Sequence, residues 1–222
     1  MKAVILAAGV GTRLGRPFPK SLSVLPDQTT ILGRQIHLLR EAGIREIIVV
    51  VGFKMTLIME KYPDVLYCYN PLYYVTNTSK SLLAGLSHAD DDTVWLNGDV
   101  VFEPEVLQRV CDHDGNAVAV NTDRCGEEEI KYRTDPEGRI VAISKTVSKA
   151  EGEAVGINRI NRSHIGMFRT CLEECRDDDY FERAIEFMIE RKGWFTAVDI
   201  SGLKCTEVDF EEDWEQARSF FD

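Results

Sequence analysis

The chain has 222 residues, of which 44% are hydrophobic, and it carries a formal net charge of −11. That length and composition allow a large core in one domain of α/β size. The negative charge argues against a nucleic-acid partner, which would need a wide basic surface. No apolar run approaches the roughly 20 residues of a membrane helix, and Met1 and Lys2 lead directly into a predicted strand without a signal-peptide pattern. We therefore expect a cytoplasmic protein that binds no membrane.

The six cysteines do not indicate a metal site or a disulfide framework. They form no Cys-x-x-Cys pair, and the closest two, Cys171 and Cys175, have helical i, i+4 spacing. The four histidines show no metal-ligand spacing either. We expect reduced thiols that pack as small hydrophobic side chains.

The first predicted strand, VILA at 4–7, breaks into a loop rich in glycine and basic residues. Gly9 and Gly11 have no Cβ, so backbone N–H groups can approach a phosphate chain there. Arg13 and Lys20 then supply positive charge. The first 26 residues contain four basic residues and no acidic one, although the whole chain is acidic. Such a local concentration of charge indicates an anion site.

Two familiar phosphate loops fit this segment less well. The dinucleotide fingerprint Gly-x-Gly-x-x-Gly places its third glycine one position before Gly15, and the Walker loop has glycine where Pro19 precedes Lys20. The alternative is an ordinary glycine-rich turn with scattered surface cations. Under that alternative, five residue types would have taken up their fixed spacings in this segment by chance. For Arg16, surface exposure and a role in the site stay equally open.

Apolar and amphipathic segments alternate through the first half of the chain, which predicts a doubly wound, mainly parallel α/β sheet. The expected strands are 4–7, 47–51, 65–69 and 93–97, and the expected helices are 31–41, 79–87 and 104–111. Ligands bind such sheets at the carboxyl ends of the strands. The opening loop and the turn Asn97-Gly98-Asp99 both follow strands, so we expect them at the same edge.

The second half begins with a predicted hairpin, in which segments 132–134 and 139–144 flank the turn Asp135-Pro136-Glu137-Gly138. The remaining expected elements are a strand at 154–160, a helix at 181–191, strands at 195–200 and 206–208, and a closing helix. No repeat or linker divides the chain. We expect one compact unit, residues 1–222, with a nucleotide half at 1–112 and an acceptor half at 113–222.

Two carboxylates are candidate metal ligands. Asp99 follows a buried strand and a glycine, where its side chain would point into the cleft, and Mg²⁺ typically binds one or two carboxylates plus substrate phosphates. Asp209 lies in TEVDFEEDWEQA, where Glu212 three residues later could make it an ordinary helix N-cap instead, and both roles can coexist. Asn77 and Ser81 begin a predicted helix, and capping explains them without function.

The opening segment resembles the L-A-A-G-x-G-T-R-L…P-K signature of the nucleotidyltransferases that join an NTP to a phosphorylated small molecule. The resemblance covers nearly the whole chain and is closest to cytidylyltransferases of the phosphocholine and phosphonate type. It implies a Rossmann-like, glycosyltransferase-A-like fold with a β-hairpin acceptor-binding insertion. It also implies transfer of CMP from CTP to a small phosphorylated or phosphonate acceptor, with Mg²⁺ as cofactor and release of pyrophosphate.

The resemblance also implies roles for individual residues. Arg13 and Lys20 match the activating Arg and Lys, and Asp99 and Asp209 match the metal ligands. The nucleotide would lie against Leu6, Ala8, Gly9, Gly11, Thr12, Asn77 and Ser81. The acceptor would lie against Lys145, which would hold its phosphate, Glu153 and, more weakly, Lys131. Lys145 could instead be a solvent-exposed lysine at a strand end.

The acceptor itself stays open. Choline would need an aromatic cage, for which Tyr180, Phe181 and Trp194 are available, although such aromatics usually belong to the core. An aminoethylphosphonate or a polyol phosphate is the alternative. Lys204-Cys205 stands where an aromatic residue often precedes the Glu-x-Asp, a departure from the family pattern. A sugar-1-phosphate thymidylyl- or uridylyltransferase and a non-catalytic nucleotide sensor remain other interpretations, and the protein could be a monomer or a homodimer.

Overall fold

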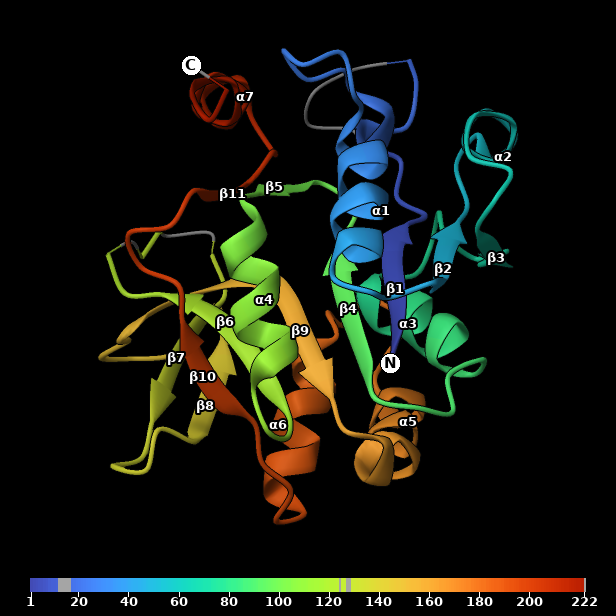
Figure 1. Ribbon diagram of the computed structural model, residues 1–222. Coiled ribbons are helices and arrows are strands. Elements are labelled where there is room, and N and C mark those ends of the chain that lie inside the picture. Colours follow the sequence, from blue (N-terminus) through green and yellow to red (C-terminus); the bar gives the residue numbers. More distant parts are fainter. Residues whose placement is uncertain (12–16, 124, 127–128, 222) are drawn as a thin grey trace.

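A computed structural model describes residues 1–11, 17–123, 125–126 and 129–221. Its centre is a large sheet with the strand order β10-β6-β9-β4-β1-β2-β3, and a β7–β8 hairpin joins it through β9 (Figure 1). The strands are β1 (Lys2–Ala7), β2 (Glu46–Val51), β3 (Leu66–Tyr69), β4 (Thr93–Asn97), β5 (Val100–Phe102), β6 (Ala117–Asn121), β7 (Lys131–Thr134), β8 (Ile140–Ser144), β9 (Gly152–Ile160), β10 (Thr196–Asp199) and β11 (Cys205–Glu207). The α-helices are α1 (Ile31–Glu41), α2 (Met55–Lys61), α3 (Thr78–Leu86), α4 (Pro104–Asp112), α5 (Ile165–Glu174), α6 (Glu182–Glu190) and α7 (Glu211–Ser219). Short 3₁₀ turns occur at η2 (Lys20–Leu22) and η3 (Arg162–His164).

The sheet is mainly parallel, as its buried apolar strands predict. Strand β1 pairs in parallel with both β2 and β4, β2 pairs in parallel with β3, and β10 pairs in parallel with β6. Strand β9 is antiparallel to both of its neighbours in the sheet, β4 and β6. The expected doubly wound α/β fold with an added hairpin is confirmed, and β9 is the strand that connects its parallel part to the hairpin.

Alternate residues of the central strands face two separate cores. Ile5 and Leu96 pack with α1 and α4 on one face of the sheet, and Val4 and Trp95 pack with α3, α5 and α6 on the other. Figure 1 shows α1 and α4 in front of the sheet. The Trp95 ring lies 5.4 to 6.2 Å from three phenylalanine rings on the far face, those of Phe168, Phe181 and Phe195. This cluster fixes the start of α6 against the sheet.

Several elements were not expected from the sequence, namely α2, β5, β6 and α5. In α2 only Ile58 is buried, so the helix shows no apolar stripe of helical period. Strand β9 begins at Gly152, two residues earlier than expected, and the predicted strand at 195–200 is shorter and covers Thr196–Asp199. Strand ends depend on pairing partners that are distant in the sequence, which local patterns do not report.

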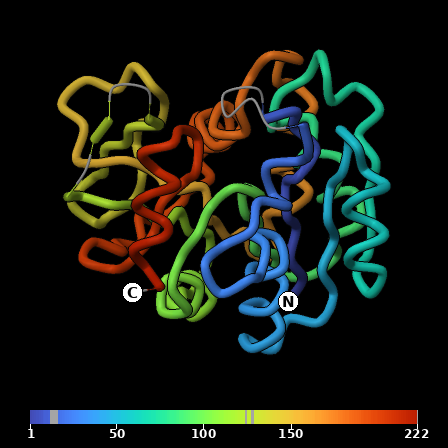
Figure 2. The backbone as a smooth tube through the Cα atoms, turned by 90° about the horizontal axis from the view of Figure 1, so that it is seen from above, coloured from blue at the N-terminus to red at the C-terminus, as the bar shows by residue number. Residues whose placement is uncertain are grey.

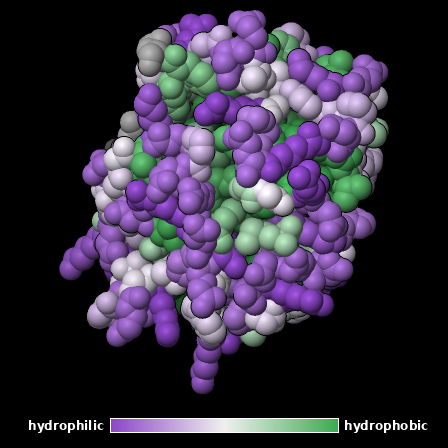
Figure 3. Space-filling model, in the orientation of Figure 1, coloured by the Kyte–Doolittle hydropathy of each residue, from purple (hydrophilic) through white to green (hydrophobic). Residues whose placement is uncertain are grey.

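The last part of the chain returns to the carboxyl edge of the sheet. Seen from above, the C-terminal segment (red) lies between the β7–β8 hairpin (yellow) and the opening segment (blue) (Figure 2). Strand β11 pairs antiparallel with β5, directly after the Asp99 turn. The face of the molecule shown in Figure 3 is mostly hydrophilic, with apolar areas near its middle. Within the described part of the chain, no helix is long and apolar enough to cross a membrane.

Candidate active site

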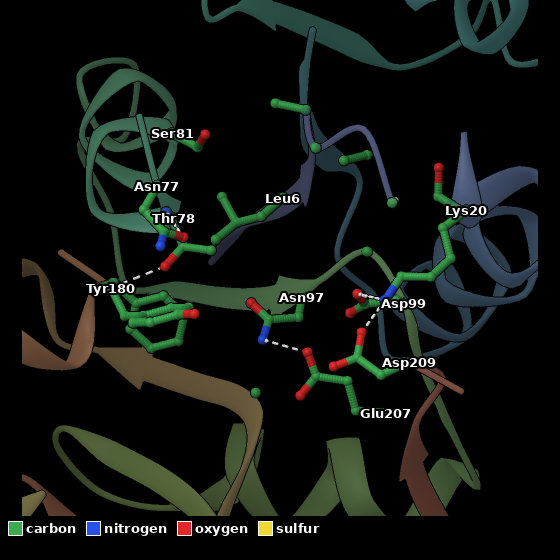
Figure 4. Close-up of a pocket in the computed structure, with 18 of the residues that line it drawn as sticks. Leu6, Lys20, Asn77, Thr78, Ser81, Asn97, Asp99, Tyr180, Glu207 and Asp209 are labelled. Carbon is green, nitrogen blue, oxygen red and sulfur yellow. Dashed lines mark hydrogen bonds and ion pairs between the residues drawn. The ribbon is translucent and has the colours of Figure 1, made fainter. Parts of the chain in front are cut away.

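A cavity of about 320 Å³ opens at the carboxyl edge of the parallel strands. Its wall comes from the end of β1, the opening loop, the start of α3, the turn after β4, β9, the start of α6 and the segment between β11 and α7 (Figure 4). Ten of the residues selected from the sequence line it: Leu6, Ala8, Gly9, Gly11, Lys20, Asn77, Ser81, Asp99, Lys145 and Asp209. One cavity therefore brings together residues that are nearly the length of the chain apart.

The other selected residues lie elsewhere. Thr12 and Arg13, like Arg16, fall outside the described residues. Glu153 lines a neighbouring cavity of about 380 Å³, whose wall is acidic and shares Glu129 and Glu207 with the first. Lys131 pairs with Glu153 across β7 and β9, and its ammonium donates a hydrogen bond to the backbone carbonyl of Lys145 at 3.2 Å. Lys131 thus contacts the backbone of a cavity residue.

At the centre of the site, the Lys20 ammonium lies between two carboxylates. Its Nζ is 2.5 Å from Asp99 Oδ2 and 2.5 Å from Asp209 Oδ1 (Figure 4). Burial alone would lower the pKa of Lys20, but the charges of both carboxylates, and hydrogen bonds to them, raise it above its usual value. Lys20 is therefore a fixed positive charge in the cavity.

Two glycines permit this arrangement. Gly11 has a φ of +64°, and a Cβ there would lie 3.1 Å from Lys20 Cβ. Gly98 lies against β1, where a Cβ would be 2.6 Å from the carbonyl oxygen of Leu6. The Gly98 N–H donates to that same carbonyl at 2.9 Å. The turn that carries Asp99 is thus held directly against the first strand.

Asp209 is not the N-cap of the last helix, contrary to one of the two interpretations of its sequence. The N-cap is Phe210, and the carboxylate that satisfies the helix start belongs to Asp213. Asp213 Oδ2 accepts hydrogen bonds from the backbone N–H groups of Asp209 at 2.9 Å and Phe210 at 2.7 Å. The Asp209 side chain instead lines the cavity and accepts a hydrogen bond from the Lys20 ammonium.

Glu207 is a site residue that the sequence reasoning did not select. It accepts a hydrogen bond from the Asn97 side-chain amide at 3.3 Å, and it lines the cavity beside Asp99 and Asp209. Burial, together with the charges of those two aspartates, raises the pKa of Glu207 well above its usual value. The Glu-x-Asp spacing of Glu207 and Asp209 is the sequence pattern that could have identified Glu207, because residues two apart in an extended segment point to the same side.

The donor set at the centre fits a magnesium ion. Asp99 Oδ1 is buried and has no hydrogen-bond partner among the described residues, and Asp209 lies across from it on the same lysine. Mg²⁺ binds proteins through one or two carboxylates and keeps water and substrate phosphates as its other ligands. Within the described residues, no group of three or more His, Cys, Asp or Glu side chains forms a metal cluster. Asp99 and Asp209 are therefore the described residues that would hold such an ion.

The α3 end of the cavity carries Asn77 and Ser81. Asn77 is the N-cap of α3, and its side-chain oxygen accepts from the Thr78 backbone N–H at 2.8 Å, as expected for capping. Its amide nitrogen donates to the Asp178 carbonyl at 3.2 Å. Ser81 lies inside the helix and accepts a hydrogen bond from the Asn70 amide at 3.1 Å, so it is not a cap. Both side chains point toward the cavity in Figure 4.

The three aromatic residues considered for a choline cage do not meet in one place. Tyr180 and Phe181 line the cavity, and the Lys145 ammonium lies 5.2 Å from the centre of the Tyr180 ring. Trp194 is outside the cavity, where it packs on His164 with ring centres 4.9 Å apart. A three-ring cage from these residues is therefore wrong, because η3 and the α6–β10 turn hold Trp194 away from the site.

A parallel sheet with a glycine-rich loop, a lysine and paired aspartates at its carboxyl edge defines a nucleotide-binding α/β protein of the transferase class. Residues 3–164 match the MobA-like NTP transferase domain, and the chain belongs to this family. The resemblance found in the sequence is thereby confirmed at the level of the family.

Three relatives illustrate the range of the family. The CMP-5'-(3-aminopropyl)phosphonate synthase of Streptomyces rubellomurinus is 36% identical over 119 residues, 50% of this chain and 19% of that protein. The choline-phosphate cytidylyltransferase of Streptococcus pneumoniae is 43% identical over 89 residues, 37% of this chain and 38% of that protein. The UTP–glucose-1-phosphate uridylyltransferase AglF of Haloferax volcanii is 26% identical over 98% of this chain and 95% of that protein. The matches to the first two thus span less than two thirds of those proteins.

Solved structures agree on the fold. The CTP:phosphocholine cytidylyltransferase from Streptococcus pneumoniae superposes with a TM-score of 0.79, covering 100% of this chain and 99% of that one. Its sequence identity is 20%, so the likeness establishes the architecture and not the substrate.

Proposed function

We propose that the protein transfers CMP from CTP to a small phosphorylated or phosphonate acceptor. An acceptor oxygen attacks the α-phosphorus of CTP, a new P–O bond forms, and the bond to pyrophosphate breaks. The observation that carries this proposal is the Lys20 ammonium held 2.5 Å from both Asp99 and Asp209 in the cavity at the strand ends. The choice of cytidine and of the acceptor class rests on the names of the phosphonate and choline-phosphate relatives.

The nucleotide would bind at the first half of the chain. Backbone N–H groups around Gly9 and Gly11 face its phosphates, and Asn77 and Ser81 lie on its base and ribose side. Lys20, with Arg13, stabilises the charge that develops as pyrophosphate leaves. Asp99 and Asp209 would hold Mg²⁺, which supplies positive charge to the phosphate oxygens when it is bound.

The acceptor would bind at the second half of the chain. Lys145 holds the acceptor's phosphate or phosphonate as a point charge. Lys131 stabilises the backbone at Lys145 by donating a hydrogen bond to the Lys145 carbonyl. Glu153, in the neighbouring cavity, lines the far side of the acceptor. The division into halves at residue 112, the cytoplasmic location and the absence of a nucleic-acid partner rest on the sequence and stay predictions.

One alternative activity has a specific observation in its favour. The uridylyltransferase of Haloferax volcanii matches 98% of this chain, which makes transfer of UMP or dTMP to a sugar 1-phosphate the second candidate. A non-catalytic nucleotide sensor is disfavoured because Lys20, Asp99 and Asp209 are all present and in contact.

An acceptor panel tests the proposal. The purified protein is incubated with CTP, Mg²⁺ and one acceptor at a time: phosphocholine, phosphoethanolamine, 2-aminoethylphosphonate, inositol 1-phosphate or glucose 1-phosphate. We expect pyrophosphate release only with an acceptor present, and a loss of that release in Lys20→Ala. Faster release from UTP with glucose 1-phosphate would establish the second candidate. No release with any pair would overturn the assignment as an active enzyme.

A further inference from the structure

One buried carboxyl group in the cavity has no task in the mechanism above. Glu182 is the first residue of α6, is 6% exposed and lines the cavity next to Tyr180 and Phe181. Its Oε2 atom is buried and has no hydrogen-bond partner among the described residues. A buried carboxylate oxygen without a partner is unfavourable, and a ligand that supplies the missing donor is one explanation for keeping such a group at a cavity wall.

The surroundings of Glu182 specify the kind of donor. Burial raises the pKa of Glu182 to about 7, while the positive charge of Lys145 acts to lower it and Glu186 acts to raise it. A bound cation with N–H groups would both donate to Oε2 and stabilise the ionised carboxylate. A neutral sugar hydroxyl would donate a hydrogen bond but would leave the buried negative charge uncompensated.

We propose that Glu182 binds the ammonium group of the acceptor through an N–H donor, so that the acceptor is an aminoalkyl phosphate or phosphonate and not a quaternary ammonium compound. This inference rests on the proposed function and makes its acceptor class specific. Lys145, on the same part of the cavity wall, supplies the opposite charge for the phosphate or phosphonate end. The two residues together select a small molecule with a cation at one end and an anion at the other.

The aromatic residues near Glu182 favour an N–H donor over a trimethylammonium group. A quaternary ammonium has no N–H and is recognised by open ring faces. The Lys145 ammonium already lies 5.2 Å from the Tyr180 ring centre, and the Phe181 ring packs edge to face on Trp95 in the core. Trp194 is outside the cavity. These rings do not form a cage around the carboxyl group.

A methylation series tests the inference. Phosphoethanolamine and its N-methyl, N,N-dimethyl and N,N,N-trimethyl forms keep the same phosphate and a cationic nitrogen at pH 7.5, but carry three, two, one and no N–H groups. For the wild-type protein we expect kcat/KM to fall at least tenfold at the last step, mainly through KM, because only that step removes the final donor. Equal or better use of the trimethyl form, phosphocholine, would overturn the inference.

The variant Glu182→Gln tests the residue itself. We expect at least a tenfold loss of kcat/KM on the three N–H acceptors and a clearly smaller loss on phosphocholine, which keeps the cationic charge but has no N–H donor to lose. Glu190→Gln, at an exposed position of the same helix, is the matched control and should change nothing. An equal loss on all four acceptors would assign Glu182 to the positioning of Lys145 and overturn the inference.

Binding measurements separate this inference from the proposed function. Calorimetric titration of the protein with phosphoethanolamine and with phosphocholine, in the presence of CMP and Mg²⁺, needs no turnover. Tighter binding of phosphoethanolamine that disappears in Glu182→Gln supports the inference even if no pyrophosphate is ever released. Should the variant fail to fold, the methylation series on the wild-type protein, read by calorimetry or kinetics, decides alone.

Discussion

The Lys20 ammonium lies 2.5 Å from the Asp209 carboxylate, so an ion pair joins the opening loop to the segment before the last helix. The two residues are 189 positions apart, and Asp99 contacts the same ammonium at 2.5 Å. Charges that are partly buried need partners, and removing one leaves the others uncompensated. This end of the cavity is therefore assembled by charge as well as by the sheet.

Replacing Lys20 by alanine should lower turnover at least about a hundredfold, because a cation aimed at developing phosphate charge acts mainly in the transition state. Initial rates of pyrophosphate release measure the effect, and circular dichroism checks that the fold is kept. Lys61→Ala, at an exposed position of α2, is the control and should retain wild-type turnover. Near-normal turnover of Lys20→Ala would refute the assignment of the phosphate loop.

The variants Asp99→Asn and Asp209→Asn should each abolish turnover, since each removes one of the two carboxylates proposed to hold Mg²⁺. EDTA should abolish turnover as well, and added Mg²⁺ should restore it. Titration of Mg²⁺ in the presence of CTP should give weaker saturation for either variant that keeps residual activity. Full turnover in EDTA would exclude the metal.

Asp213→Ala provides the contrast to Asp209→Asn. Since Asp213 caps α7, its loss should lower the free energy of unfolding by about 1 kcal/mol, the usual effect of a lost helix cap, and should leave turnover within a few-fold of wild type. Urea unfolding and pyrophosphate release measured on both variants separate the two roles. If Asp209→Asn lost only stability and Asp213→Ala lost turnover, the two assignments would have to be exchanged.

Residues that the sequence selected on local chemistry are among those that the structure brings to the cavity. Gly9, Gly11 and Lys20 are recognisable because the loop needs close backbone approach and charge within a short segment. Asp99 is recognisable because it follows a buried strand at the carboxyl edge of the sheet. The alternating elements of the first half predicted that edge correctly because parallel strands read as continuous apolar runs.

Other features could not be predicted because they depend on contacts distant in the sequence. The capping interpretation of Asp209, with Glu212 three residues later, is wrong because α7 starts one residue later than that pairing requires, so that Phe210 is the N-cap and Asp213 its partner. Glu182 looks like an ordinary acidic residue at a helix start, and only its packing in the cavity shows that it is buried. Trp194 is close to Phe181 in the sequence, but the turn after α6 places Trp194 outside the cavity that Phe181 lines.

The stability of the protein without ligands should depend on the ionisation of Glu182. Burial raises its pKa from the ordinary value of 4.5 to about 7, so the folded protein binds a proton that the unfolded chain releases between these pH values. The contribution of this group to the free energy of unfolding is therefore greatest below pH 4.5 and decreases as the pH rises to about 7. Glu182→Gln cannot ionise and should show none of this decrease.

Urea unfolding of both proteins at pH 5 and pH 8 measures the effect. The stability of Glu182→Gln relative to the wild-type protein should increase from pH 5 to pH 8. Glu190→Gln should follow the wild-type curve at both pH values. The opposite trend, with Glu182→Gln relatively less stable at pH 8, would mean that Glu182 is ionised and paired in the folded protein, with Lys145 as the nearest cation that acts on it.

The enzyme should prefer CTP over UTP and dTTP by at least about tenfold in kcat/KM. Cytosine carries an amino donor where uracil and thymine carry a carbonyl acceptor, and a pocket built to pair with one leaves buried polar groups unpaired with the other. The start of α3, with Asn77, Thr78 and Ser81 on the cavity wall, is the segment expected to face the base. An NTP panel with one fixed acceptor measures the preference.

Ser81→Ala should reduce the preference for CTP, whereas Ser87→Ala, at the exposed end of the same helix, should not. If UTP or dTTP were used at least tenfold better than CTP, the sugar-1-phosphate alternative would replace the cytidylyl assignment, and the same α3 segment would then have to read a base with an acceptor in that position.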